Sequence, residues 1–311
     1  MQGALAFLHR FAFNGNGAER MKKRLMGLLL LTLLCVCLGA SAEDYALPVD
    51  FSGGYTPSEA NYTKDTYEDE SLSVKMEKRD VDGVRYDIAW IKVKSPTQLR
   101  TALAGAPNQV VAEKPGKMAR RLNAVVAING DFYTQRKDGL IYRQGVMVRP
   151  DINPEKDVLV IDDQGDFHNF LGSETQAQEL VDFLKSGRTI VNAFTFGPAL
   201  IRQGEVLPMP DAYKTRFDSA VRSPRTVIAQ MGPLEYVFVE AEGRNAISKG
   251  VTTDQMAQFM ATLGVAEAYC LDGGNSSIMF FHNRYYDSNY AASERLQSDI
   301  VYVVTAVPDG R

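Results

Sequence analysis

The sequence predicts an α+β protein with mixed, largely antiparallel sheets, a few covering helices and a single domain. Many short apolar runs are separated by turns rich in Gly and Asp, which is typical of strands. Few segments have helical periodicity, and these begin at capping residues and stop at glycine. The chain has 311 residues, 45% of them hydrophobic and 23% charged, which suits one large domain or two small ones.

The first 42 residues have the pattern of a targeting segment. Residues 21–24 (Met-Lys-Lys-Arg) are positively charged, residues 25–38 are apolar, and Ala40-Ser41-Ala42 matches a signal peptidase site. We therefore expect translation to start at Met21 and cleavage near Ala42, giving a secreted or extracytoplasmic protein. The apolar run is shorter than the roughly 20 residues that cross a membrane, so no membrane span is expected after cleavage.

Charge and cysteine content narrow the class of protein. The net charge is −4 and the pI is near 5.6, so we expect no nucleic-acid partner. Cys35 and Cys37 lie in the predicted signal peptide, which leaves Cys270 alone in the mature chain. An intramolecular disulfide is therefore not expected.

The predicted domain covers residues 71–307. Residues 43–70 resemble an N-terminal arm or linker, or else a strand that tucks along the domain. Residues 84–93 form a long strand candidate with apolar side chains on both faces. Ser95-Pro96 predicts the start of a short helix that ends before Gly105, because Ser is a good N-cap and Pro suits the first helical position.

Helices and strands alternate through the rest of the domain. A helix at 117–122 is followed by a buried strand at 124–128. Capping boxes at 173–176 and 252–255 predict two further helices, stopped by Gly187 and Gly264. The other short strand candidates are residues 157–161, 189–191, 226–229 and 234–239.

Two predicted strands end in an acid beside glycine. The strand at 124–128 leads into Asn129-Gly130-Asp131, and the apolar approach 265–271 leads into residues 272–277, Asp-Gly-Gly-Asn-Ser-Ser. Glycine leaves the backbone N–H groups unshielded, and successive N–H groups in such a turn can bind an anion. Each motif alone also fits a plain strand–turn–strand hairpin. Two strand-end acids in one chain favour a functional site.

Two further turns carry arginine at strand ends. Arg225-Thr226 follows a proline at the mouth of an apolar strand, and Glu242-Gly243-Arg244 ends the next strand. Arginine suits bidentate binding of phosphate or carboxylate. Each arginine is also compatible with an ordinary surface charge.

Five segments together resemble the phosphodiester glycosidase family. They occur in the family's order within about residues 70–305, and five matches in order are specific where one is weak. The segments are Ala127–Tyr133, Phe196–Leu200, Ser223–Thr226, Glu242–Arg244 and Leu271–Ser277. Three positions depart from the family pattern, because Ser223 stands where Asn is usual, Glu242 where Asp is usual and Asn275 where Gly is usual.

The resemblance implies a single catalytic domain that hydrolyses a sugar from a glycosyl phosphodiester. The substrate would be an N-acetylglucosamine 1-phosphodiester or a phosphate-linked surface polysaccharide. Such a reaction needs carboxylates at the anomeric carbon, for which Asp131 and Asp272 are the first choices and Glu242 the third. The candidate substrate and phosphate ligands are Asn129, Gly130, Arg225, Thr226, Arg244, Gly273, Gly274, Ser276 and Ser277.

Alternatives remain for the cofactor and the function class. A divalent cation, Ca²⁺ or Mg²⁺, held by Asp131 and Asp272 is an open alternative, because these ions prefer oxygen ligands, but the spacing of the two acids does not itself show a metal site. Ser276 and Ser277 are expected to donate hydrogen bonds, since neither histidine of the mature chain stands in a triad pattern. Two other classes stay open: a non-catalytic glycan-binding or exopolysaccharide-assembly protein, and a metal-dependent phosphodiesterase that cuts P–O instead of C–O.

Overall fold

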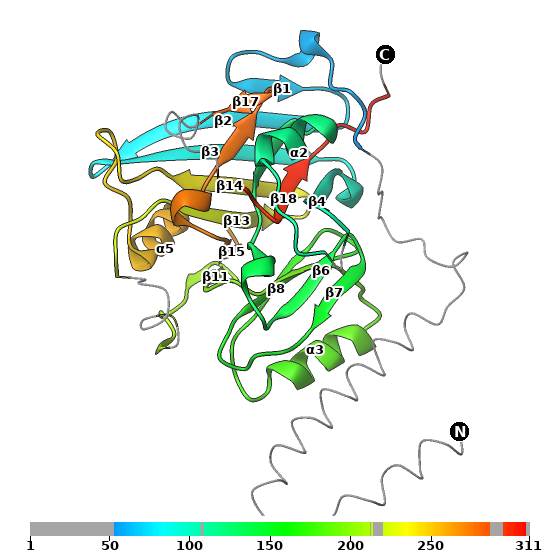
Figure 1. The fold of residues 1–311 in the computed structure, drawn as a ribbon, viewed down its shortest axis with the longest axis vertical. Helices are drawn as coiled ribbons and strands as arrows, with labels where there is room; N and C mark the ends of the chain where they lie inside the picture. Colours follow the sequence, from blue (N-terminus) through cyan, green and yellow to red (C-terminus); the bar gives the residue numbers. More distant parts are fainter. Residues whose placement is uncertain (1–52, 107–108, 212, 214–219, 287–294, 309–311) are drawn as a thin grey trace, which may run out of the picture. The chain divides into compact units, whose positions relative to one another are not determined.

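The computed structural model describes residues 53–106, 109–211, 213, 220–286 and 295–308. The predicted signal peptide and the start of the predicted arm lie outside these residues. Three antiparallel sheets with short helices make up the described domain, which confirms the α+β prediction (Figure 1). In the described part of the chain, no helix is long and apolar enough to cross a membrane.

The largest sheet has eight strands and includes the strands that lead to most of the predicted site. Its order is β1 (Thr66–Glu68), β2 (Leu72–Val81), β3 (Val84–Val93), β14 (Glu235–Ala241), β13 (Arg225–Gly232), β15 (Glu267–Cys270), β11 (Ala199–Arg202) and β12 (Glu205–Val206). The bounds of β3 are those predicted from its alternating pattern.

Two five-stranded sheets complete the domain. One has the order β17 (Arg284–Tyr285), β16 (Met279–Phe281), β5 (Val126–Asn129), β18 (Asp299–Val303) and β4 (Leu99–Leu103). The other has the order β7 (Val146–Pro150), β6 (Leu140–Arg143), β10 (Ile190–Phe194), β8 (Val158–Asp162) and β9 (Phe167–Phe170). The helices are α2 (Pro115–Arg121), α3 (Gln176–Lys185) and α5 (Thr253–Thr262), with 3₁₀ turns η2 (Glu59–Asn61), η3 (Pro96–Gln98), η4 (Tyr133–Gln135) and η5 (Gly274–Ser276).

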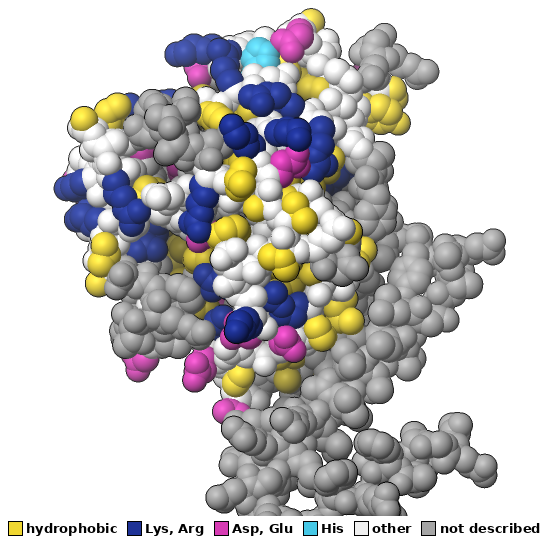
Figure 2. Space-filling view, in the orientation of Figure 1, with side chains coloured by type: hydrophobic (Ala, Val, Ile, Leu, Met, Phe, Trp, Pro, Cys, Tyr) yellow, Lys and Arg dark blue, Asp and Glu magenta, His cyan; other side chains and the backbone are white. Residues whose placement is uncertain are grey.

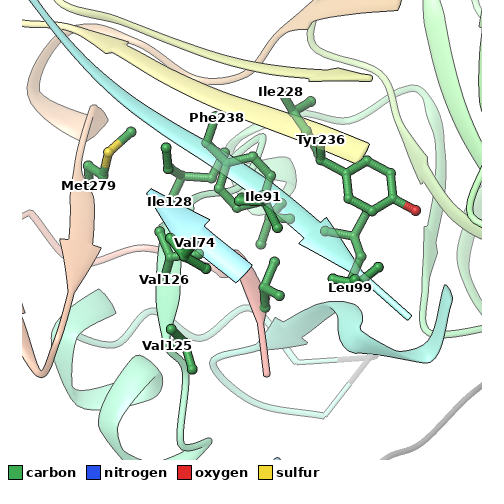
Figure 3. Close-up of a cluster of buried hydrophobic side chains, with 14 of the residues drawn as sticks. Val74, Ile91, Leu99, Val125, Val126, Ile128, Ile228, Tyr236, Phe238 and Met279 are labelled. Carbon is green, nitrogen blue, oxygen red and sulfur yellow. The ribbon is translucent and has the colours of Figure 1, made fainter. Parts of the chain in front are cut away.

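The main core lies on one face of the eight-stranded sheet. Figure 3 shows Phe238 and Ile228 from this sheet together with Ile128 and Met279 from β5 and β16. The opposite face packs on α5, whose Met256 and other apolar side chains form a second buried cluster. Both faces of the central strands are therefore buried, as the pattern of β3 predicts.

The core-facing surface of the large sheet changes from apolar to polar over two residues along each strand. The apolar row is Met76, Ala89, Phe238 and Ile228, in register on β2, β3, β14 and β13. Two residues further along each strand, the row on the same face is Lys78, Asp87, Glu240 and Thr226. This polar row lies at the end of the sheet where β13 begins and β14 ends.

One predicted element differs from the structure, and for residues 43–70 the structure agrees with the strand alternative at Thr66–Glu68. The helix predicted between Ser95 and Gly105 is a single 3₁₀ turn, η3, and the chain then enters strand β4. The predicted N-cap at Ser95 is present and forms a capping box with Gln98, but residues 99–103 then pair with β18 as a strand. The predicted arm is in part an integral strand, because β1 pairs with β2 and Tyr67 is 1% exposed.

Of the caps predicted for the two longer helices, one is present and the other is not. The capping box predicted at Thr252 is present, with Thr252 accepting from Gln255 N and the Gln255 side chain accepting from Thr252 N. At the start of α3 the N-cap is Thr175, and its side chain makes no cap hydrogen bond. The capping box predicted for residues 173–176 was therefore wrong, although the helix was right.

Candidate active site

The two predicted strand-end motifs meet in the structure. Asn129, at the end of β5, is fully buried and makes four hydrogen bonds that join them. Its Nδ2 donates to Asp272 O at 2.8 Å and to Gly130 O at 2.9 Å. Its Oδ1 accepts from Thr226 Oγ1 at 2.8 Å and from Ile278 N at 3.2 Å. Asn129 and Thr226 therefore fasten the loops to each other, and their polar atoms are occupied by protein partners.

Asp272 has a buried carboxylate oxygen without a hydrogen-bond partner. Its Oδ1 accepts from Gly273 N at 3.1 Å, whereas Oδ2 has no partner among the residues that the structure describes. Burial raises the pKa of Asp272, and a hydrogen bond from Ser276 and the charges of Arg136 and Arg295 oppose this rise. A buried, unpartnered acceptor costs free energy, so its retention points to a role for a ligand.

Asp131 is fully buried in an ion-pair cluster. Arg143 Nη2 donates to Asp131 Oδ1 at 2.6 Å and to Asp299 Oδ2 at 2.7 Å, and Thr195 N donates to Asp131 Oδ2 at 3.3 Å. Burial raises the pKa of Asp131. The positive charge of Arg143 opposes this rise, and the negative charge of Asp299 adds to it. Both oxygens of Asp131 are engaged, so the structure gives this acid a different environment from that of Asp272.

Gly130 allows the chain to pass against this cluster. Its N–H donates to Asp299 O at 3.0 Å, and a Cβ added at Gly130 would collide with the Asp299 carboxylate. Glycine is needed here because of this close approach.

The backbone N–H groups of Gly273 and Gly274 are used within the protein. Gly273 N donates to the Asp272 carboxylate, and Gly274 N donates to Pro224 O at 2.8 Å. Gly274 has φ of +63°, which favours glycine. A Cβ at Gly273 would lie 2.9 Å from Pro224 O. These glycines therefore pack the loop onto the start of β13, and the cationic side chains remain as candidates for a phosphate.

The two predicted arginines have different surroundings. Arg225 is half-buried, and its guanidinium donates to the carbonyls of Val251 at 3.2 Å and Val221 at 3.1 Å. Burial lowers the pKa of Arg225. Because Arg225 and Thr226 are neighbours on one strand, their side chains lie on opposite faces of the sheet. Arg225 is therefore on the face away from Asn129.

Arg244 is exposed and lies against the glycine loop. Its Nη1 donates to Asn275 Oδ1 at 3.3 Å, and its Nη2 donates to Ser223 Oγ at 3.0 Å. Two of the three departures from the family pattern, Ser223 and Asn275, thus meet at one arginine. They hold its guanidinium beside Gly274.

Glu242 belongs to a buried acidic cluster that the sequence did not indicate. Lys78 Nζ lies 2.6 Å from Asp87 Oδ1 and 3.9 Å from Glu242 Oε1. Asp87 is 0% exposed, and Glu240, which pairs with it across β3 and β14, is 3% exposed. Burial raises the pKa of Asp87 to about 7, opposed by Lys78 and reinforced by Glu242. Two carboxylates, Asp87 and Glu242, beside one lysine favour a shared proton.

The two serines of the loop are buried but differ in their partners. Ser276 Oγ accepts from Arg295 Nη1 at 3.1 Å, and its carbonyl accepts from Gln297 Nε2. Ser277 Oγ has no hydrogen-bond partner among the described residues. Ser277 and Asp272 therefore each bring one unpartnered oxygen to the same loop.

Sequence reasoning missed Arg136, Arg143, Arg295, Asp87 and Glu240. Asp87 and Glu240 lie inside regular strands, where only the alternation of polar and apolar positions was visible. Arg136 lies over the Phe196 ring at 4.0 Å and Arg295 over the Phe132 ring at 4.5 Å, which are contacts between distant segments. A buried polar residue on the apolar face of a strand is the one signal that identifies Asp87 and Glu240.

The two acids predicted as possible metal ligands have cationic neighbours. Within the described ranges, no three Asp, Glu, His or Cys side chains converge as metal ligands. Asp131 is occupied by Arg143, and Asp272 has cationic neighbours.

Comparison with protein families and curated sequences gives two matches. Residues 122–304, more than half of the chain, match the model of the phosphodiester glycosidase family. The SPbeta prophage-derived uncharacterized protein YomE of Bacillus subtilis (strain 168) is 28% identical over 192 residues, which is 60% of this chain. The match covers 29% of that relative, so the chain spans less than a third of its length.

Two solved structures have similar folds. One is the catalytic domain of zebrafish N-acetylglucosamine-1-phosphodiester alpha-N-acetylglucosaminidase, auto-inhibited by its pro-peptide. It has a TM-score of 0.59 and 19% identity, and the match covers 85% of this chain and 99% of that one. The other, a hypothetical protein from Synechocystis, has a TM-score of 0.58 and 16% identity over 75% of this chain and 62% of that one. These likenesses establish a shared fold.

Proposed function

This chain belongs to the phosphodiester glycosidase family, and we propose that it is a hydrolase that releases a sugar from a glycosyl phosphodiester. Family and fold support a function of this type. The substrate we propose is an N-acetylglucosamine 1-phosphodiester, which the name of the zebrafish relative supports, or a phosphate-linked surface polysaccharide. Export of the mature chain is part of the proposal and depends on the signal-peptide pattern of residues 21–42.

The observation that carries the proposal is the unpartnered carboxylate oxygen of Asp272. In the proposed reaction the bond between the anomeric carbon and the phosphate oxygen breaks, and the electron pair leaves with the phosphate. Water attacks the anomeric carbon, and its proton passes to the ionised Asp272 carboxylate. Because a phosphate ester is a good leaving group, the reaction needs no strong general acid. A negative carboxylate also stabilises the oxocarbenium-like transition state.

Three arginines around the glycine loop are assigned to the phosphate. Arg136 and Arg295 act electrostatically on Asp272, and Arg244 lies beside Gly274. Guanidinium groups bind phosphate oxygens through charge-assisted hydrogen bonds. Ser277 Oγ, which has no partner among the described residues, is a further donor for the sugar or the phosphate.

The other predicted acids are assigned to positioning. Asp131 holds Arg143 and the end of β5, which keeps the Asn129 bridge to Asp272 in place. Glu242 lies in the cluster with Asp87 and Lys78, so its charge is linked to theirs. A positioning role predicts that loss of either acid disturbs the fold as well as the rate.

Release of sugar by the mature chain tests the proposal. Wild type, Asp272→Asn and the exposed control Asp182→Asn would be assayed on UDP-N-acetylglucosamine and N-acetylglucosamine 1-phosphodiesters, with and without EDTA. We expect turnover by wild type and Asp182→Asn, none above background by Asp272→Asn, and no effect of EDTA. Binding without turnover by wild type would favour a glycan-binding protein.

The position of bond cleavage separates the glycosidase from a phosphodiesterase. Hydrolysis in ¹⁸O-labelled water followed by mass spectrometry reports which product gains the label. Label in the sugar is expected for C–O cleavage. Label in the phosphate, together with loss of activity in EDTA, would refute the glycosidase mechanism and favour the metal-dependent phosphodiesterase.

A further inference from the structure

A cavity of about 370 Å³ is lined by residues of β2, β16 and β17 and by the residues just before β1. Figure 1 shows β17 beside β1 and β2. The volume of the cavity is in the range of small-ligand pockets. Three cationic side chains line it, and so do three aromatic rings. The cations are Lys64, Lys78 and Arg284, and the rings are those of Phe281, Tyr285 and Tyr286.

The charge of this cavity is opposite to that of the whole chain. The net charge of the chain is −4, whereas the cavity has three cations and one acid, Asp65, among its lining residues. Asp65 accepts from the Tyr286 hydroxyl at 3.3 Å, and its Oδ2 lies 3.8 Å from Lys64 Nζ in a solvent-exposed ion pair. Arg284 is exposed and has no ion-pair partner within the described ranges. The cavity therefore offers cationic donors to an anionic ligand.

The surrounding surface extends this positive charge. Figure 2 shows Lys and Arg side chains gathered over the region of α2 and β17. The exposed cations of this helix and its N-cap are Lys114, Lys117, Arg120 and Arg121. Glu113 pairs with two of them, Lys117 and Arg121. The net positive charge of this surface favours an extended anionic ligand over a single small ion.

Lys78 links the cavity to the buried acidic cluster, and β16 links it to the glycine loop. Lys78 lines the cavity and lies 4.3 Å from the centre of the Tyr286 ring, while its Nζ pairs with Asp87 of the acidic cluster. Tyr286 N donates to Met279 O at 2.8 Å, and Met279 begins β16 two residues after Ser277. The chain therefore runs from the glycine loop through β16 to Phe281, which lines the cavity.

We propose that this cavity is a subsite for a further phosphate-bearing sugar unit of a polymeric substrate. The inference rests on the proposed function and specifies its substrate class, a phosphodiester-linked glycan longer than one unit. Arg284 and Lys64 bind the phosphate, because both are exposed cations at the cavity. The aromatic rings contact the apolar face of the sugar.

Binding of ligands of different length tests this inference. The double variant Lys64→Gln/Arg284→Gln would be compared with wild type by isothermal titration calorimetry. The probes are a methyl phosphodiester of N-acetylglucosamine 1-phosphate and an oligomer of three phosphodiester-linked N-acetylglucosamine units. We expect the double variant to bind the oligomer about tenfold more weakly and the single unit within about twofold of wild type.

A control variant separates the subsite from general charge effects. Lys75→Gln/Lys92→Gln removes the same charge from β2 and β3 of the same sheet, at exposed positions on its other face. We expect this control to bind both probes as wild type does, and all variants to keep the wild-type circular dichroism. Equal weakening in the control, or unchanged oligomer binding in Lys64→Gln/Arg284→Gln, would overturn the subsite.

Failure of the proposed function gives a different result. In that case wild type hydrolyses neither probe, whereas the dependence of oligomer binding on Lys64 and Arg284 is measured without turnover. Hydrolysis of the single unit combined with oligomer binding that ignores these two residues would retain the function and remove the subsite.

Discussion

Replacing Asp272 by Asn separates the cost of a buried charge from its use in the reaction. Asn keeps the size of the side chain and an acceptor oxygen for Gly273 N, but it removes the negative charge. In the wild type that charge is disfavoured by burial, as the raised pKa of Asp272 records. The substitution therefore removes the unfavourable free energy of a buried charge from the folded state. In the proposed reaction it also removes the general base.

The two effects have different expected magnitudes. Loss of a general base costs typically 10²- to 10⁴-fold in rate, which is about 3 to 5 kcal/mol of transition-state free energy. The free energy of unfolding should change by about 1 kcal/mol or less, and toward greater stability at neutral pH. The sign follows from linkage: a carboxyl whose pKa is raised on folding contributes stability at low pH that is lost as pH rises through the folded pKa.

The assay is the pH dependence of the rate of sugar release beside thermal unfolding of the same samples. Wild-type activity should fall on acidification through a pKa above the ordinary Asp value of 3.8, because the proposed base must be ionised. Asp272→Asn should lack this acidic limb and have a melting temperature equal to or slightly above that of wild type at neutral pH. Retention of more than about a tenth of the wild-type rate, or loss of rate only together with the fold, would refute the assignment of Asp272.

Three further predictions follow from the buried polar groups. Arg143→Met should lower the free energy of unfolding by about 3 to 5 kcal/mol, since it leaves two buried carboxylates without their cation, and Asp131→Asn should cost less than half as much; urea unfolding that reverses this order would contradict the shared ion pair. Gly130→Ala should cost about 3 kcal/mol or more through steric collision, against about 1 kcal/mol or less for Gly232→Ala, whose added Cβ meets nothing within 4 Å. The melting temperature of wild type should fall as pH rises from the ordinary Asp value through about 7, and Asp87→Asn should reduce this fall; an unchanged slope would exclude Asp87 as its source.

Local patterns predicted much of the fold because they are set by nearby residues. The period-two alternation of Val84–Val93 predicted β3 with the observed bounds. The cap at Ser95 was also right, yet the helix after it was wrong. Capping describes one turn, whereas the strand β4 depends on its pairing with β18, about 200 residues later. Tertiary pairing outweighs local propensity in such a segment.

The candidate site was likewise predicted only in part. The motifs around Asp131 and Asp272 indicated which segments would meet, and the Asn129 hydrogen bonds join them. The environment of each acid could not be predicted from its own segment. Asp131 is neutralised by Arg143 and shares it with Asp299, and no local spacing connects these three residues. Whether an acid is paired with a cation or keeps an unpartnered oxygen therefore depends on residues far away in the sequence.

The polar row on the large sheet determines which positions of the sheet can be substituted without loss of strand pairing. Met76, Ala89, Phe238 and Ile228 lie two residues along their strands from the polar row, about 7 Å away. The backbone ladder is the same for both rows, so pairing of the strands does not depend on which side chains occupy the polar end. Substitution at that end can therefore alter chemistry while the neighbouring apolar row keeps the sheet assembled. A new specificity in this architecture needs only a change of side chains at one rim of an unchanged sheet.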